Sequence, residues 1–98
     1  MKEIRAYIQP FMLTRLTQTL LEIPHFPGMK VSDCVDHFGY EKVIKEDDLK
    51  LFVTKKRIEI FAHDELVDSI VNAIISNANV YQQSIEDVYI INVLCRKI

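Results

Sequence analysis

The sequence predicts an α+β domain over residues 1–98, in which one four-stranded antiparallel sheet carries two helices on one face. The first observation is the order of hydrophobic patterns, which runs strand, helix, strand, strand, helix, strand. The second is that the only two glycines, Gly28 and Gly39, bracket one strand-like segment. The third is the length of 98 residues, which suits one modest core. Together these features predict a ferredoxin-like βαββαβ sandwich.

The first strand and the first helix follow from a change of hydrophobic period. Residues 2–9 alternate, with apolar side chains at every second position. After Pro10 the apolar residues recur at helical spacing: Leu13, Leu16, Leu20 and Ile23. The helix is expected to end before Pro24, because a proline cannot continue the hydrogen-bond ladder. Gly28, which follows a proline, then turns the chain into the next strand.

The second and third strands are predicted on either side of a charged loop. Residues 29–38 alternate up to Gly39, and residues 41–48 carry charges without a clear period. The third strand is expected to start near Leu49. Its apolar phase slips at the basic run 55–57, which predicts a bulge or a break in the strand.

The second helix and the last strand complete the pattern. Asp64 is a favourable N-cap, and a wide apolar stripe continues to about Asn77. A polar connection is expected at 79–86, and the strand 87–94 is apolar on both faces, so it is central in the sheet or covered by another subunit. The sheet face away from the helices is predicted to carry apolar side chains: Tyr7, Cys34, Phe52, Tyr89, Ile91 and Val93. Such a face predicts a homo-oligomer.

Composition and charge restrict the function further. The net charge is −2, which does not favour binding to nucleic acid or to an anionic membrane. No apolar run approaches the roughly 20 residues of a spanning helix, and the charged N-terminus does not resemble a signal peptide, so no direct membrane insertion is expected. We therefore expect a cytoplasmic protein whose Cys34 and Cys95 are reduced thiols.

The sequence holds no catalytic constellation, so we expect no enzymatic activity. Weak candidates for a metal site are Cys34, His37 and Cys95. Because Cys34 and His37 are three residues apart in a strand, they would face opposite sides and would not share a metal without a bend. The basic run 55–57 is either a solvated strand end or an anion site formed with a neighbouring subunit, which Arg96 could join.

Two long segments resemble a known family. "MKEIRAYIQPFMLTRLTQTLLEI" followed by "PGMKVSD", and later "KKRIEIFAHDELVDSIVNAIISNA", are similar to the nitrogen regulatory PII signalling proteins. The resemblance implies a homotrimer whose sheets face the trimer centre and whose intersubunit clefts bind adenine nucleotides. It also implies a loop between the second and third strands that docks onto a membrane transporter or a regulated enzyme.

The resemblance also implies roles for individual residues. Gly39 matches the last glycine of the family's Gly-Phe-Gly, although His37 stands at the first and Tyr40 stands where an arginine would follow. The implied effector-binding residues are Lys30, Gly39, Lys55, Arg57 and Arg96. The implied partner-binding loop, at about 40–50, contains Tyr40, Glu41, Lys42, Lys45 and Asp47. This loop is shorter than the family's usual one and lacks the tyrosine-bearing segment that some members have modified.

The largest departure from the family lies at residues 79–87. The family has a glycine-rich turn with a lysine that holds phosphates there, whereas this chain has "NVYQQSIED". We therefore expect altered or lost ATP and ADP sensing, with an adenine nucleotide bound weakly or in a non-standard way. The alternative function is a metal-tolerance trimer, CutA-like or efflux-associated, that binds a divalent metal through Cys34, His37 and Cys95.

Overall fold

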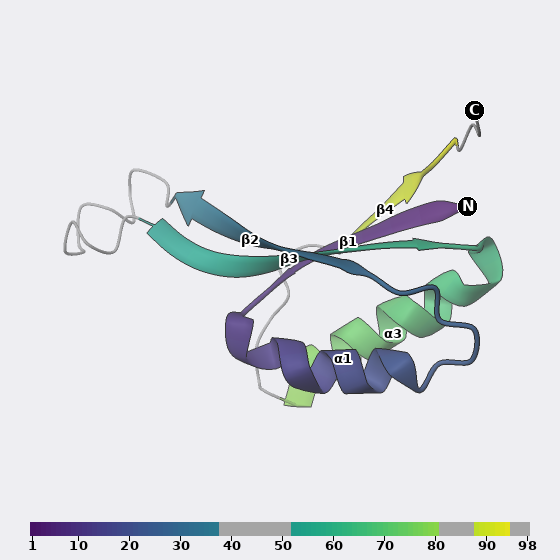
Figure 1. The fold of residues 1–98 in the computed structure, drawn as a ribbon, viewed down its shortest axis with the longest axis horizontal. Helices are drawn as coiled ribbons and strands as arrows, with labels where there is room; N and C mark the ends of the chain where they lie inside the picture. The colour runs from purple at the N-terminus through teal and green to yellow at the C-terminus, as the bar shows by residue number, and fades with distance from the viewer. Residues whose placement is uncertain (38–51, 81–87, 95–98) are drawn as a thin grey trace.

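A computed structural model describes residues 1–37, 52–80 and 88–94 of the chain (Figure 1). The elements are β1 (Lys2–Ile8), the 3-10 helix η1 (Pro10–Met12), α1 (Leu13–Leu21), β2 (Lys30–His37), β3 (Phe52–Ala62), α3 (Asp64–Val80) and β4 (Val88–Asn92). This order is the one that the hydrophobic patterns predict.

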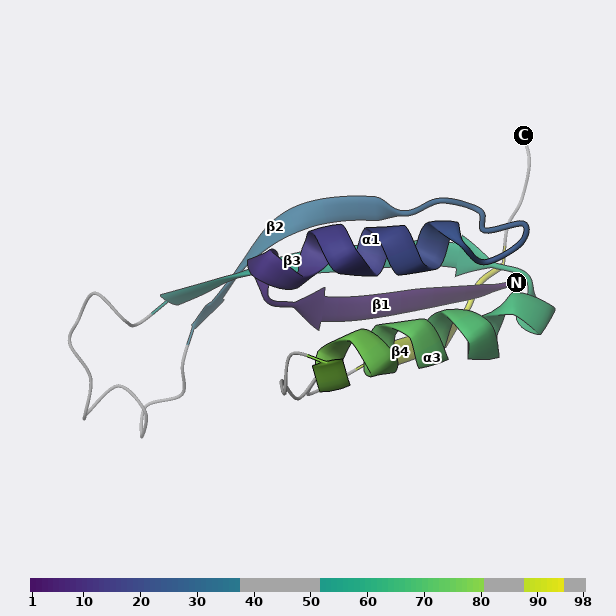
Figure 2. The same ribbon diagram turned by 90° about the horizontal axis from the view of Figure 1, so that it is seen from below.

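The described strands form one antiparallel sheet in the order β2-β3-β1-β4. Helices α1 and α3 lie side by side on one face of it (Figure 1 and Figure 2). The ferredoxin-like α+β fold is therefore confirmed. The last strand was expected to be central in the sheet or covered by another subunit, and the first alternative is wrong because β4 is an edge strand paired with β1. Cover by another subunit stays a prediction.

The core lies between the sheet and the two helices. Six even-numbered apolar residues of β1 and β3 face the helices and are almost fully buried: Ile4, Ala6, Ile8, Ile58, Ile60 and Ala62. They pack with the apolar stripes of the helices, which supply Met12, Leu16, Leu20, Ile70 and Ile74. Burying a side chain of this size stabilises the fold by about 1.5–3 kcal/mol, so this layer holds the sheet and helices together.

Helix α3 is longer than predicted. It runs to Val80, three residues beyond Asn77, and Ala78 is buried within it. The segment Ala78–Val80 contains neither glycine nor proline, so nothing in it breaks the helix. The predicted start of a polar connection at residue 79 is therefore wrong, because that residue is still helical.

Strand β3 contains no bulge, so that prediction is wrong. It pairs without interruption with β2 from Phe52 to Glu59 and with β1 from Lys56 to Ala62. Residues 56–59 of β3 pair with both β1 and β2, whereas residues 52–55 pair with β2 alone. The apolar residues of β3 change phase at the point where pairing with β1 ends. Phe52 begins β3, and the predicted place of its side chain on the face away from the helices stays a prediction.

The turn between α1 and β2 contains two residues with positive φ. Gly28 has φ +93°, and a Cβ built there would meet no atom within 4 Å, so its backbone conformation is what requires glycine. His25 has φ +64° directly after Pro24. These residues reverse the chain after the helix, as the turn signal at Gly28 predicts. Gly39 lies outside the described residues.

Candidate functional site

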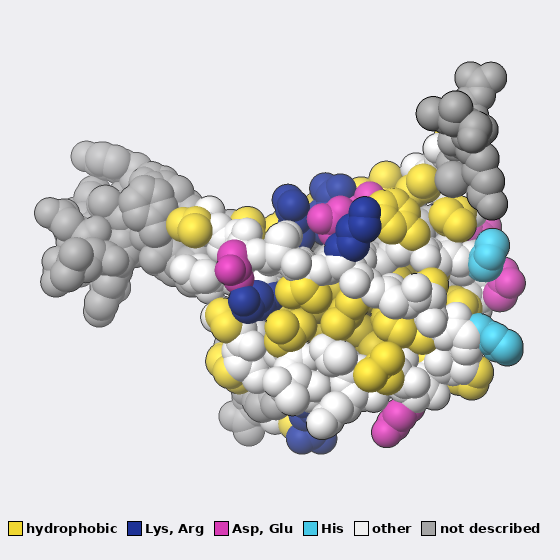
Figure 3. All heavy atoms as spheres, viewed as in Figure 1, with side chains coloured by type: hydrophobic (Ala, Val, Ile, Leu, Met, Phe, Trp, Pro, Cys, Tyr) yellow, Lys and Arg dark blue, Asp and Glu magenta, His cyan; other side chains and the backbone are white. Residues whose placement is uncertain are grey.

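The candidate site is the sheet face turned away from the helices, which we call the open face. Strand register places on it Lys30, Ser32 and Cys34 of β2; Lys55, Arg57, Glu59 and Phe61 of β3; Glu3, Arg5 and Tyr7 of β1; and Tyr89 and Ile91 of β4. Figure 3 shows basic and acidic side chains gathered along the side of the sheet opposite the helices. The open face is therefore charged as well as aromatic.

Three cross-strand rows organise its polar residues. In the first, Glu59 lies between Lys30 on β2 and Arg5 on β1. In the second, Arg57 lies between Ser32 and Tyr7. In the third, beyond the end of β1, Cys34 lies opposite Lys55. Residues directly opposite each other on one face have Cβ atoms only about 5 Å apart, so each row is a potential contact.

The centre of the open face holds two pairs of opposite charge. Both Nε and Nη2 of Arg5 lie 2.8 Å from Oε2 of Glu3, whose side chain is almost buried. The hydrogen bond to Glu3 raises the pKa of Arg5 above its ordinary value, against the opposing effect of burial. On the neighbouring strand, Nε of Arg57 lies 3.2 Å from Oε1 of Glu59. Arg5 and Glu59 are opposite each other, so the two pairs adjoin.

Aromatic rings flank these charges. Tyr7 and Tyr89 make an edge-to-face contact, with ring centroids 6.4 Å apart and an interplanar angle of 88°. Nζ of Lys30 lies 5.7 Å from the centroid of the Phe61 ring, within the range of a cation–π contact. Tyr89 and Ile91 on the edge strand remain 46% and 38% exposed. This surface combines rings, cations and carboxylates, which suits a polar contact better than a purely apolar one.

The structure brings together three of the five predicted effector-binding residues. Lys30, Lys55 and Arg57 all belong to the open face of β2 and β3. Gly39 and Arg96 lie outside the described residues, as does every named residue of the predicted partner-binding loop: Tyr40, Glu41, Lys42, Lys45 and Asp47.

The predicted metal ligands are not gathered in the described part of the chain. Cys34 lies on the open face, and His37 is the last residue of β2. The predicted facing of these two side chains to opposite sides stays a prediction. Cys95 falls outside the described residues. Within residues 1–37, 52–80 and 88–94, no group of three or more metal-ligating side chains comes together.

The carboxylates and the hydroxyl of this face are not among the site residues that the sequence predicts. They belong to Glu3, Glu59 and Ser32, and Arg5 lies beside them. The signal is nevertheless present: the triplets "EIR" at 3–5 and "RIE" at 57–59 place opposite charges two apart, on the same side of a strand. Only the pairing of β1 with β3 shows that the two triplets adjoin.

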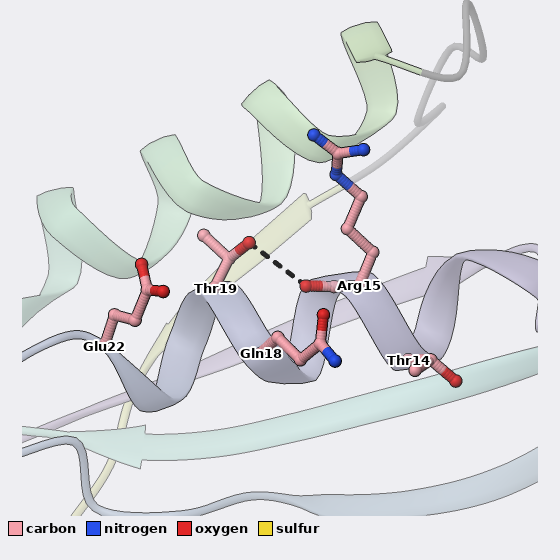
Figure 4. A pocket seen from close by; sticks show the side chains of 5 residues that line it. All are labelled: Thr14, Arg15, Gln18, Thr19 and Glu22. Carbon is pink, nitrogen blue, oxygen red and sulfur yellow. Dashed lines mark hydrogen bonds between the residues drawn. The ribbon is translucent and has the colours of Figure 1, made fainter.

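A concave surface lies on the helical side. A shallow groove of about 470 Å³ is lined by Thr14, Arg15, Gln18, Thr19 and Glu22, all from the α1 segment (Figure 4). Oγ1 of Thr19 donates to the Arg15 carbonyl oxygen at 3.1 Å and accepts from Nδ2 of buried Asn77 at 3.2 Å. This contact joins α1 to α3, so the groove is built around a structural hydrogen bond. It contains none of the predicted site residues.

The described chain contains no helix with both the length and the apolar character needed to cross a membrane. A comparison with curated proteins finds no match to the chain. A comparison with protein families matches residues 1–94 to the family described as nitrogen regulatory protein P-II. This match covers nearly the whole chain, including both segments that carry the resemblance, and the four-stranded sheet with two helices agrees with it. The chain therefore belongs to the P-II family of nitrogen regulatory proteins.

Proposed function

We propose that this chain is a non-enzymatic, cytoplasmic signal-transduction protein that controls a transporter or an enzyme by direct contact. The observation that carries the proposal is the P-II family match over residues 1–94, because members of this family are regulatory proteins. Within this proposal, residues 1–98 form one domain, and the short segment at about 40–50 binds the regulated partner.

The working form of the protein would be a homotrimer assembled through the open face. Partly exposed Tyr89 and Ile91 support this, because such side chains gain by leaving water at an interface. Light scattering after gel filtration should give three times the chain mass of 11.5 kDa. A stable monomer at micromolar concentration would contradict the trimeric assembly.

The effector would be an adenine nucleotide bound differently from the family's usual mode. The grouping of Lys30, Lys55 and Arg57 on one face supports retained anion binding. This chain has "NVYQQSIED" in place of the family's glycine-rich turn, which supports weaker binding of phosphates. Isothermal titration with ATP and ADP tests this: we expect weak binding or none, and tight binding to the unaltered chain would refute the altered sensing.

The regulatory role itself is tested by partner capture. The intact chain and a variant with residues 40–50 replaced by a glycine-serine linker would be immobilised and exposed to native cell extract, including solubilised membranes. We expect a transporter or an enzyme to be retained by the intact chain and lost from the variant. Equal retention of every protein by both would contradict a partner-binding role for this segment.

A further inference from the structure

The segment that forms α1 carries two charges whose positions do not favour a helix. Arg15 and Glu22 are the only charged residues within residues 10–22, "PFMLTRLTQTLLE". Arg15 is the third residue of α1, and Glu22 follows its last residue. Because negative charge is favoured near the start of a helix and positive charge near its end, both side chains oppose the macrodipole of α1. Helix stability therefore does not explain where they stand.

These two charges lie at opposite ends of the α1 groove. Arg15 and Glu22 are exposed and two helical turns apart, about 10 Å along the helix axis. Among the described residues, neither side chain forms an ion pair. Figure 4 shows both rising from the same side of α1, with Thr19 between them. The groove thus has one positive and one negative end, and both are open to a second molecule.

This order of charges is complementary to itself. Consider a second copy of α1 laid antiparallel on the first, with a two-fold axis between residues 18 and 19. Residues 15 and 22 are equally far from that axis, so Arg15 of each copy lies opposite Glu22 of the other. Gln18 comes next to the axis, where an amide can both donate and accept a hydrogen bond. The macrodipoles of antiparallel helices also attract each other, so the same helix reversed fits the groove.

Exposed apolar side chains adjoin the charged stripe. Phe11, which is 56% exposed, stands in line with it, four residues before Arg15. Leu21, which is 68% exposed, adjoins Glu22. Both side chains lose contact with water when a second helix covers this side of α1, which adds a favourable term to the ion pairs.

We propose that the groove along α1 is the docking site for α1 of a second copy of this chain, in an antiparallel contact with two-fold symmetry. Nδ2 of Asn77 on α3 donates to Thr19, so the groove keeps its shape before the copies meet. The helices and the open face lie on opposite sides of the sheet, so this contact leaves the open face uncovered (Figure 2). One pair of helices makes a small interface, and we expect a dissociation constant in the micromolar to millimolar range.

The test is the mass of the full chain in solution, measured by light scattering from micromolar to millimolar concentration. The variants are Arg15→Glu, Glu22→Arg and the double variant that carries both changes. Each single reversal places like charges opposite each other in the two-fold contact, whereas the double variant exchanges the charges and restores both ion pairs. The matched control is Asp68→Arg, which changes the net charge as Glu22→Arg does, at an exposed position of α3 outside the groove lining.

The mass of the unaltered chain, the double variant and Asp68→Arg should double as the concentration rises. Each single reversal should weaken this association about tenfold or more. The two single variants should associate when they are mixed, because two acidic positions then face two basic ones. Each reversal also moves the charge of α1 in the direction that its macrodipole favours, so neither single variant should melt at a lower temperature. Misfolding would then not account for the lost association.

The results separate this inference from the proposed function. A trimer whose mass never doubles, or doubles equally in both single variants, overturns the inference and leaves the proposed function intact. A chain that passes only from monomer to dimer, in a manner that depends on Arg15 and Glu22, supports the inference and contradicts the proposed trimer. If the mass never doubles but both single variants lose a protein that the unaltered chain captures, the groove binds a different partner and the inference is wrong.

Discussion

The two faces of the sheet are made by alternate residues of the same strands, yet their side chains differ in burial and in hydrogen bonding. The face toward the helices presents Ile4, Ile58 and Ile60, each with no exposed surface. The open face presents paired charges, tyrosines at 7 and 89, and two buried polar atoms without partners. In the described chain the centre of the helix-side face is thus covered by apolar packing, whereas the open face keeps polar groups without a partner. The predictions below test this difference, from the largest expected effect to the smallest.

The helix-side face should be the most sensitive to truncation. Ile60→Ala removes a fully buried side chain at the centre of the core and should lower the free energy of unfolding by about 2–5 kcal/mol. Ile91→Ala, on the open face and 38% exposed, is the matched control and should cost clearly less at protein concentrations where the chain is monomeric. Urea denaturation of both measures the contrast, and equal losses would show that the two faces do not differ as described.

The second-largest loss of stability is expected from breaking the Glu3–Arg5 pair at the centre of the open face. Glu3→Gln keeps the shape of a nearly buried side chain but removes the charge that binds Arg5. Leaving Arg5 with a weaker partner should cost about 1–3 kcal/mol in the free energy of unfolding. Glu22→Gln, an exposed residue of the α1 groove, is the control and should change little. A neutral Glu3→Gln would mean that this pair is only a surface contact.

The turn leading into β2 allows a test that involves neither face. Gly28→Ala should cost about 1–2 kcal/mol through its backbone alone, since a methyl group at that position meets nothing within 4 Å. Gly28→Asn should cost less, because asparagine tolerates positive φ better than alanine. If the two variants were equally stable in thermal unfolding, backbone conformation would not be the reason for glycine.

The smallest effect is expected from the ion pair of Lys56 and Asp33, near the root of the part of β2 and β3 that β1 does not reach. The Asp33 side chain is 68% exposed, so solvent screens this pair. Lys56→Gln should therefore change the free energy of unfolding by less than about 1 kcal/mol. A larger loss of unfolding free energy in urea denaturation would mean that the Lys56–Asp33 pair stabilises the fold more than an exposed ion pair normally does.

Most of the fold is readable from the sequence because alternation and helical spacing are local signals. The core positions of β1, α1 and α3 follow from them directly. The wrong prediction of a bulge in β3 and the open alternatives for β4 share one cause: each depends on which strand lies next to which. The register of β3 against β1 and β2 depends on residues far away in the chain, so a change of neighbour looked like a break.

The candidate site was only partly predictable for the same reason. Lys30, Lys55 and Arg57 could be named from the family resemblance, and they share one face. Ser32 could not be recognised, because its importance comes from lying opposite Arg57, which is 25 positions later in the chain. A serine in an edge strand is unremarkable until the partner strand shows that its hydroxyl is buried and unpaired.

The unequal lengths of the strands have a mechanical consequence. Four residue pairs of β2 and β3, from Cys34–Lys55 to His37–Phe52, extend past the last pair between β1 and β3. At about 3.3 Å per residue this two-stranded arm projects roughly 13 Å from its support. It acts as a cantilever, so a load on its tip produces the greatest bending moment at its root. The Ser32–Arg57 pair lies one residue inside that root, where the bending moment is close to its maximum.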